Sequence, residues 1–98
     1  MKAVFNNQII AESDRTISFE GSTYFPKSSI VEKYFKKSKV SSICDEKGVA
    51  HYYSIEVKGQ FRDEAAWCYP ETTEYAKVVE NYIAFWKGIR IERSSTSL

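Results

Sequence analysis

The stretch V-A-H-Y-Y-S-I-E-V, residues 49–57, is the clearest strand signal in this 98-residue chain. Aromatic and β-branched residues dominate it, as is typical of a pleated, half-buried strand. Its alternation predicts two faces, one carrying Ala50, Tyr52, Ser54 and Glu56, and the other carrying Val49, His51, Tyr53, Ile55 and Val57.

Further strand segments flank this one and are separated by short turns. Asn6-Asn7 and Glu20-Gly21 each separate two strand-like runs, and Lys58-Gly59 turns residues 49–57 into Gln60-Phe61-Arg62. Near the end of the chain, Lys87-Gly88 lies between two more such runs. We count about eight short strands, and hairpins at this spacing predict antiparallel sheets.

Two short helices are also predicted. The first begins at Ser29, with Glu32 completing a capping box, and ends in the lysine cluster of residues 33–39. The second is capped by Thr72 or Thr73. The apolar stripe of the first is Ile30, Val31, Tyr34 and Phe35, and that of the second is Tyr75, Val78, Val79 and Tyr82. The prediction is a mainly-β fold with two short helices, as a single domain over residues 1–93 with a frayed tail at 94–98.

Charge and composition narrow the classes of partner. The formal net charge is +1, which gives no general attraction to nucleic acid or membrane surfaces. No apolar run approaches the roughly 20 residues of a membrane span. The opening residues lack a signal-peptide core, and the two cysteines form no C-x-x-C pair, so we expect reduced thiols and a cytoplasmic protein with no nucleic-acid or membrane partner.

Metal and nucleotide sites are not indicated. Cys44, His51 and Cys68 are the soft metal ligands, too few and too scattered for a structural zinc site. Neither G-x-x-x-x-G-K-[ST] nor G-x-G-x-x-G is present, so the sequence does not predict a phosphate-binding loop made of backbone N–H groups. We therefore predict no metal and no cofactor, while Lys47, Lys87 and Arg90 leave phosphate binding through side chains open.

Three aromatic–cation clusters are the strongest functional signal, at residues 44–53, 65–70 and 84–90. Each combines rings that can stack on a ligand with charged or hydrogen-bonding groups, as binding pockets do. The simpler alternative is that the rings are core and the lysines extend into water. The candidate ligand-binding residues are Tyr24, Lys47, Tyr52, Trp67, Tyr69, Trp86, Lys87 and Arg90, and the expected ligand is an anionic or carbonyl-bearing small molecule.

Two other classes of function stay open. An enzyme would use Lys87 or Lys47 as electrophile or base, with Tyr52, His51 or Glu71 as proton donor. Such a lysine needs a pKa lowered by burial or by a neighbouring cation. A protein–protein module or homodimer would instead present its aromatics as a flat patch without a cavity, or pair through free edge strands.

The same clusters resemble a known family. The motifs Y-F-P (24–26), C-x-x-K-G-x-A-x-Y-Y (44–53), A-A-W-x-Y-P (65–70) and A-F-W-K-G-I-R-I-E (84–92) are similar, in order, to the domain of unknown function 427 family. The likeness extends from the opening residues to about Glu92, with a departure at Asp45-Glu46, where the family often has Pro or Gly and then Trp. The resemblance implies a mainly-β domain with two antiparallel sheets, as in the β-tent architecture. The family is sometimes labelled nucleotidyltransferase-like, but the Gly-Ser step and spaced aspartate pair of polymerase-type nucleotidyltransferases are absent here.

Overall fold

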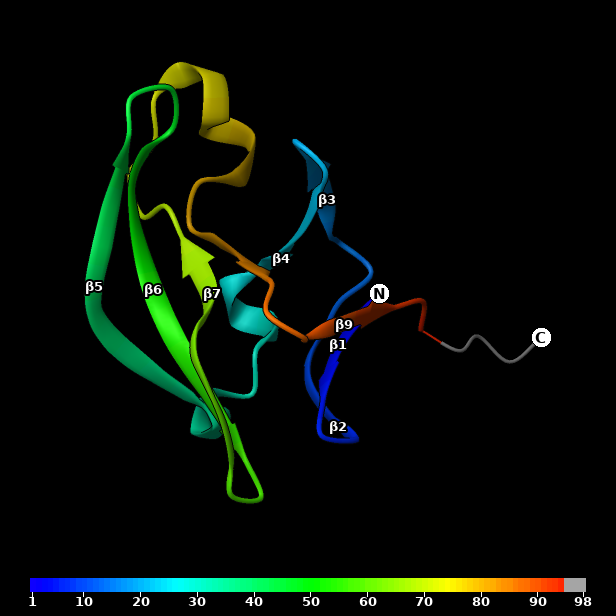
Figure 1. Cartoon of the computed structure of the whole chain (residues 1–98). Coiled ribbons are helices and arrows are strands. Elements are labelled where there is room, and N and C mark those ends of the chain that lie inside the picture. Colours follow the sequence, from blue (N-terminus) through cyan, green and yellow to red (C-terminus); the bar gives the residue numbers. More distant parts are fainter. Residues whose placement is uncertain (95–98) are drawn as a thin grey trace.

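The computed structural model describes residues 1–94 as two antiparallel sheets (Figure 1). The smaller sheet has the strand order β2-β1-β9, and the larger has the order β3-β4-β8-β7-β6-β5. The strands are β1 (Lys2–Phe5), β2 (Gln8–Glu12), β3 (Ile17–Phe19), β4 (Ser22–Pro26), β5 (Phe35–Cys44), β6 (Gly48–Val57), β7 (Gln60–Cys68), β8 (Tyr82–Phe85) and β9 (Arg90–Glu92). The predicted mainly-β class and antiparallel sheets are confirmed. The predicted tail at 94–98 lies outside the described residues from position 95 onward.

The three predicted hairpin turns are confirmed. Both central residues of Asn6-Asn7, Glu20-Gly21 and Lys58-Gly59 have positive φ, between 50° and 81°, which matches the twist of the flanking strands. Lys87-Gly88 also turns the chain with positive φ, but β8 and β9 do not pair with each other. This turn instead carries the chain from the larger sheet to the smaller one.

The first predicted helix is wrong. Residues 27–35 contain two single 3₁₀ turns, η1 (Lys27–Ser29) and η2 (Glu32–Tyr34), with extended backbone at Ile30 between them. Ile30 bridges Ala11, and the Val31 N–H donates to the Ile10 carbonyl at 2.8 Å. Pairing of these β-branched residues with β2 therefore overrides the local capping signal, and the lysine cluster continues into strand β5.

The second predicted helix is also a 3₁₀ segment, η3 (Glu74–Val79), without a side-chain cap. Its buried residues are Ala76 and Val79, three apart, because a 3₁₀ helix has three residues per turn. Tyr75 and Val78, expected on the apolar face, are more than half exposed. None of the helical segments in the described residues has the length and apolarity to cross a membrane.

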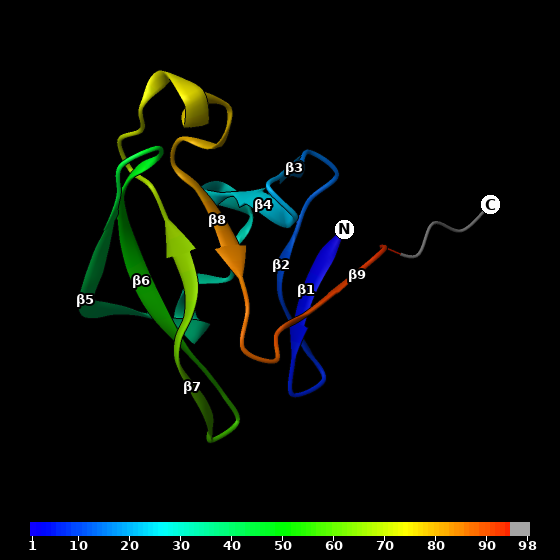
Figure 2. The same ribbon diagram turned by 45° about the horizontal axis from the view of Figure 1, so that its top comes forward.

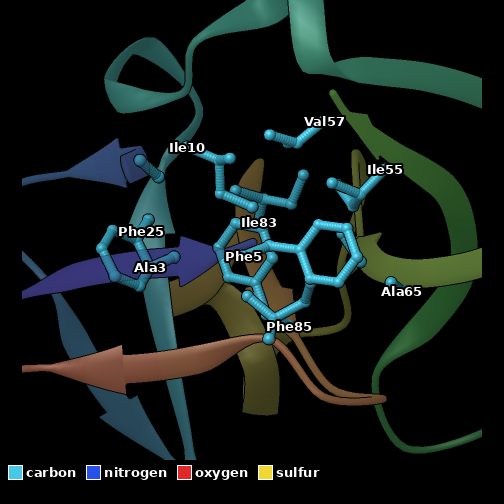
Figure 3. Packing of buried hydrophobic residues seen from close by; sticks show 12 residues of the cluster. Ala3, Phe5, Ile10, Phe25, Ile55, Val57, Ala65, Ile83 and Phe85 are labelled. Carbon is cyan, nitrogen blue, oxygen red and sulfur yellow. The ribbon is translucent and has the colours of Figure 1, made fainter. Parts of the chain in front are cut away.

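The larger sheet is packed on both faces. One face meets the smaller sheet across a core that contains Phe5, Ile10 and Phe25 (Figure 3). The opposite face carries a second cluster, built from Tyr24, Ala50, Tyr69, Ala76, Val79 and Ala84, which η3 and β3 cover. Along β6 the two faces therefore pack into different cores: Ile55 and Val57 belong to the first core and Ala50 to the second, whereas Val49 is exposed. The two faces predicted for residues 49–57 are confirmed at these residues.

Candidate functional site

A cavity of about 270 Å³ opens on the face of the larger sheet that carries the second cluster. Strands β4, β8, β7 and β6 run side by side beneath it (Figure 2). Its walls come from the sheet, from the β3–β4 and β5–β6 turns, and from the segments that follow β7 and β8. The lining residues are Glu20, Ser22, Tyr24, Lys47, Tyr52, Trp67, Tyr69 and Trp86.

The floor of the cavity is a row of side chains across three paired strands. Tyr52 in β6 is directly opposite Trp67 in β7, and Trp67 is opposite Ala84 in β8. Because Ala84 is small, the Trp67 indole reaches over it to Tyr24 in β4. Trp67 Nε1 donates to Tyr24 Oη at 3.2 Å, and the two rings meet edge to face at 6.1 Å between centroids. The register of the sheet thus places these rings together.

Trp86 forms the rim and is held in place although it is 47% exposed. Its Nε1 donates to the Glu64 carbonyl at 2.6 Å, and its backbone N–H donates to the Ala65 carbonyl at 2.9 Å. Glu64 has φ 45° at an irregularity of β7, so a strained backbone residue presents this acceptor. The ring also packs edge to face on Trp67, with centroids 5.7 Å apart. Trp86 is therefore an exposed aromatic surface with a fixed orientation.

The β5–β6 turn carries Lys47 into the cavity wall, and a close backbone approach fixes it there. The Lys47 carbonyl accepts from the Thr73 N–H at 3.2 Å, and the Thr73 hydroxyl donates to the Glu46 carbonyl. Gly48 has φ 126° and bridges Thr72, and a Cβ at this position would lie 2.6 Å from the Glu71 carbonyl oxygen. The glycine is thus required for the packing that positions Lys47.

A carboxylate completes the polar side of the cavity. Lys47 Nζ lies 2.7 Å from Glu20 Oε1, and Tyr75 Oη donates to Glu20 Oε2 at 2.6 Å. These hydrogen bonds, from Lys47 first and Tyr75 second, lower the pKa of Glu20. In return, the hydrogen bond to Glu20 raises the pKa of Lys47, which therefore stays protonated.

Tyr24 and Tyr69 bring two further hydroxyl groups to the lining of the cavity. The oxygen of Tyr24 accepts from Trp67. Burial raises the pKa of Tyr69 to about 12, with a further contribution from nearby Tyr24, while Lys47 opposes the shift. Burial likewise raises the pKa of Tyr24. Both hydroxyls therefore remain protonated near neutral pH and can donate to an oxygen of a ligand.

The structure brings six of the eight candidate residues to this cavity: Tyr24, Lys47, Tyr52, Trp67, Tyr69 and Trp86. Lys87 does not line it, because its ammonium lies over the Trp86 ring at 5.2 Å and donates to the Asp63 carbonyl at 3.2 Å. Arg90 is in β9, in the other sheet, and pairs with Glu92.

Two lining residues, Glu20 and Ser22, were not anticipated from the sequence. Glu20 stands at a position of positive φ, 51°, that Asn, Asp or Gly usually fills in a two-residue hairpin. A glutamate at this turn position is therefore unusual. Lys58 occupies the same position of its own turn, with φ 51°, so an unusual residue there does not by itself indicate a site. The sequence could therefore mark Glu20 as unusual without assigning it a partner.

Of the groups proposed for catalysis, Lys47 and Tyr52 line this cavity, whereas Lys87, His51 and Glu71 do not. His51 and Glu71 line a separate hollow of about 300 Å³ beside Gly48 and Thr72. Lys47 does meet a carboxylate, but Glu20 raises its pKa, and a catalytic base or amine nucleophile needs the opposite shift. Within residues 1–94, no three His, Cys, Asp or Glu side chains gather as a metal-binding group. The contact with Glu20 therefore opposes activation of Lys47 as a base or nucleophile.

A comparison with protein-family models identifies the relatives of this chain. The model described as "Domain of unknown function (DUF427)", which carries the label NTP_transf_9, matches residues 1–95. No curated protein matches the chain. Because the match covers nearly the whole chain, the protein belongs to the DUF427 family.

Proposed function

We propose that this DUF427 domain is a binding module for a small planar molecule that carries a hydrogen-bond-accepting oxygen. The observation that carries the proposal is Trp86: a large aromatic ring, 47% exposed, is fixed by the Glu64 carbonyl and by Trp67 at the mouth of a cavity. A ring that is already ordered loses little conformational entropy when a ligand stacks on it. Such preorganisation favours binding.

The chemistry of the walls supports the type of ligand. Tyr24 and Tyr69 supply protonated hydroxyls, and Trp67 and Trp86 supply apolar surface. Ligand sites are typically concave and mostly apolar with a few placed polar groups, and those for drug-sized molecules begin near 300 Å³. A cavity of about 270 Å³ fits a molecule of one or two rings. The presence of a hollow also favours this function over a flat protein–protein patch.

Nuclear magnetic resonance tests the proposal directly, because the chain has two tryptophans and both line the cavity. Planar single-ring compounds with a carbonyl group, beginning with benzamide, are titrated into ¹⁵N-labelled protein. We expect saturable shifts of both indole N–H signals. We also expect a rise in melting temperature, corresponding to about 2.7 kcal/mol at 100 times the dissociation constant.

A matched pair of variants provides the control. Trp86→Ala removes the rim ring and should abolish binding, whereas Phe61→Ala removes a ring of similar exposure, 46%, that does not line the cavity, and should leave it unchanged. Equal binding by Trp86→Ala and wild type would refute the proposed site. Shifts confined to residues far from the cavity would do the same.

A further inference from the structure

The carboxylate of Glu20 accepts hydrogen bonds from other segments of the chain in the way that the carboxylate of a bound ligand would. Each of its oxygens accepts from a different segment: Lys47 Nζ in the β5–β6 turn at 2.7 Å, and Tyr75 Oη in η3 at 2.6 Å. A cation and a hydroxyl, one on each oxygen, are strong partners for any carboxylate. A carboxylate from outside the chain would use the same two donors.

On the cavity side, Lys47 is fixed more firmly than Glu20. The Lys47 side chain is 16% exposed, and its turn is tied to Thr72 and Thr73. The Glu20 side chain is 35% exposed and stands on a two-residue turn. Glu20 can therefore rotate into solvent without repacking its surroundings, while Lys47 stays at the cavity wall.

The charges favour a monoanionic carboxylate over other ions. Among the described residues that line the cavity, Lys47 is the one cation and Glu20 the one carboxylate. While Glu20 is in place these charges cancel, so an anionic ligand gains little unless it takes the place of Glu20. A phosphate dianion would find a single cation there, whereas one carboxylate group restores the neutral pair.

We infer that Glu20 fills the anion subsite of this cavity with the chain's own carboxylate, and that the ligand is a ring compound with one carboxylate group that exchanges with Glu20. The inference rests on the proposed function, since the ring of the ligand uses the Trp67 and Trp86 walls. The released Glu20 turns toward solvent. The ligand carboxylate then accepts from Lys47 and Tyr75, and Tyr24 and Tyr69 donate to any further oxygen on the ring.

Two matched compounds test the exchange. Benzoate and its neutral amide, benzamide, are titrated into the full chain and followed by the two indole N–H signals. In Glu20→Gln we expect benzoate to bind roughly three- to fivefold more tightly than in wild type, the change expected when a partly exposed ion pair no longer competes. Benzamide does not need Lys47, so its affinity should stay within about twofold.

Three further variants isolate the cause. Glu46→Gln makes the same change of net charge beside Lys47 but does not line the cavity, and should bind benzoate as wild type does. Adding Lys47→Met to Glu20→Gln should remove the gain. Glu20→Asn also removes the charge, with a residue that tolerates positive φ, and should reproduce the gain even if Glu20→Gln folds poorly.

The outcomes separate the two claims. Benzoate binding that is no tighter in Glu20→Gln and Glu20→Asn than in Glu46→Gln overturns the exchange, while benzamide shifts in the same samples keep the ring site. If neither compound moves either indole signal in any folded variant, the ring site and the exchange both fall.

Discussion

Replacing Gly48 by alanine should destabilise the fold far more than an ordinary turn substitution. A Cβ at Gly48 would lie 2.6 Å from the Glu71 carbonyl oxygen, which is backbone and cannot swing away as a side chain could. The residue also has φ 126°, a conformation that alanine adopts only under strain.

The structure allows the magnitude to be worked out. Backbone strain at such a position costs about 1–3 kcal/mol. Separating residues 47–48 from residues 72–73 also weakens the hydrogen bond from the Thr73 N–H to the Lys47 carbonyl, which is worth about 1 kcal/mol. The total is about 3 kcal/mol, a large fraction of the roughly 5–15 kcal/mol that stabilises a domain.

Gly59→Ala is the matched control. Gly59 also has positive φ, 81°, but a Cβ there would have nothing within 4 Å, so only strain of about 1 kcal/mol is expected. The entropy that alanine removes from the unfolded chain is the same for both variants and cancels in the comparison. Urea denaturation followed by tryptophan fluorescence measures the difference, which should also appear as a melting temperature lower by about 10 °C in Gly48→Ala.

Equal losses of stability in the two variants would refute this reasoning. They would show that the β5–β6 turn is not packed tightly against residues 71–73. The position of Lys47 at the cavity wall would then lose its main structural support.

Two further predictions concern ionisation and thiol reactivity. Hydrogen bonds from Lys47 and Tyr75 hold the pKa of Glu20 below its ordinary value of 4.5, so its stabilising contribution is present above that value and is lost as pH falls through the folded-state pKa. The melting temperature should therefore drop more between about pH 5 and pH 3 in wild type than in Glu20→Gln, and equal drops would contradict the contact. Burial raises the pKa of Cys68 and shields it, whereas Cys44 is only partly buried, so a disulfide-exchange reagent should react with one thiol of the native protein. Cys44→Ser should remove that fast reaction, and a second fast thiol would count against the burial of Cys68.

The parts of the fold that depend on local chemistry could be predicted from the sequence. Asn6-Asn7 and Lys58-Gly59 form tight turns because Asn6, Asn7 and Gly59 tolerate positive φ, whatever the rest of the chain does. The helix predicted from Ser29 failed because Ile30 and Val31 pair with β2, far away in sequence. A capping box is worth about 1 kcal/mol, and strand pairing with burial easily exceeds that.

The residues of the candidate site also divide into those that a local sequence pattern could predict and those that it could not. Trp67 and Tyr52 could be anticipated because strand residues that combine a ring with a polar end gather at the walls of cavities. The sequence favours Lys87 as a site residue because it follows Trp86. In the structure its ammonium lies over the Trp86 ring, and Lys87 does not line the cavity. The sequence does not predict Glu20 as a site residue. Its contact with Lys47 joins residues 27 positions apart, and no local sequence pattern indicates such a contact.

Three strained or close-packed backbone positions lead to the same cavity. Glu20 at φ 51° places its carboxylate beside Lys47, Gly48 at φ 126° holds the turn that carries Lys47, and Glu64 at φ 45° presents the carbonyl that orients Trp86. The two glutamate conformations oppose folding by about 1–3 kcal/mol each and persist because the surrounding structure determines them, whereas a glycine adopts positive φ without that strain. Turns that do not line the cavity also have this conformation, for example Lys58 at φ 51°. Under the proposed function, side chains that the backbone already holds in place lose little conformational entropy when a ligand binds.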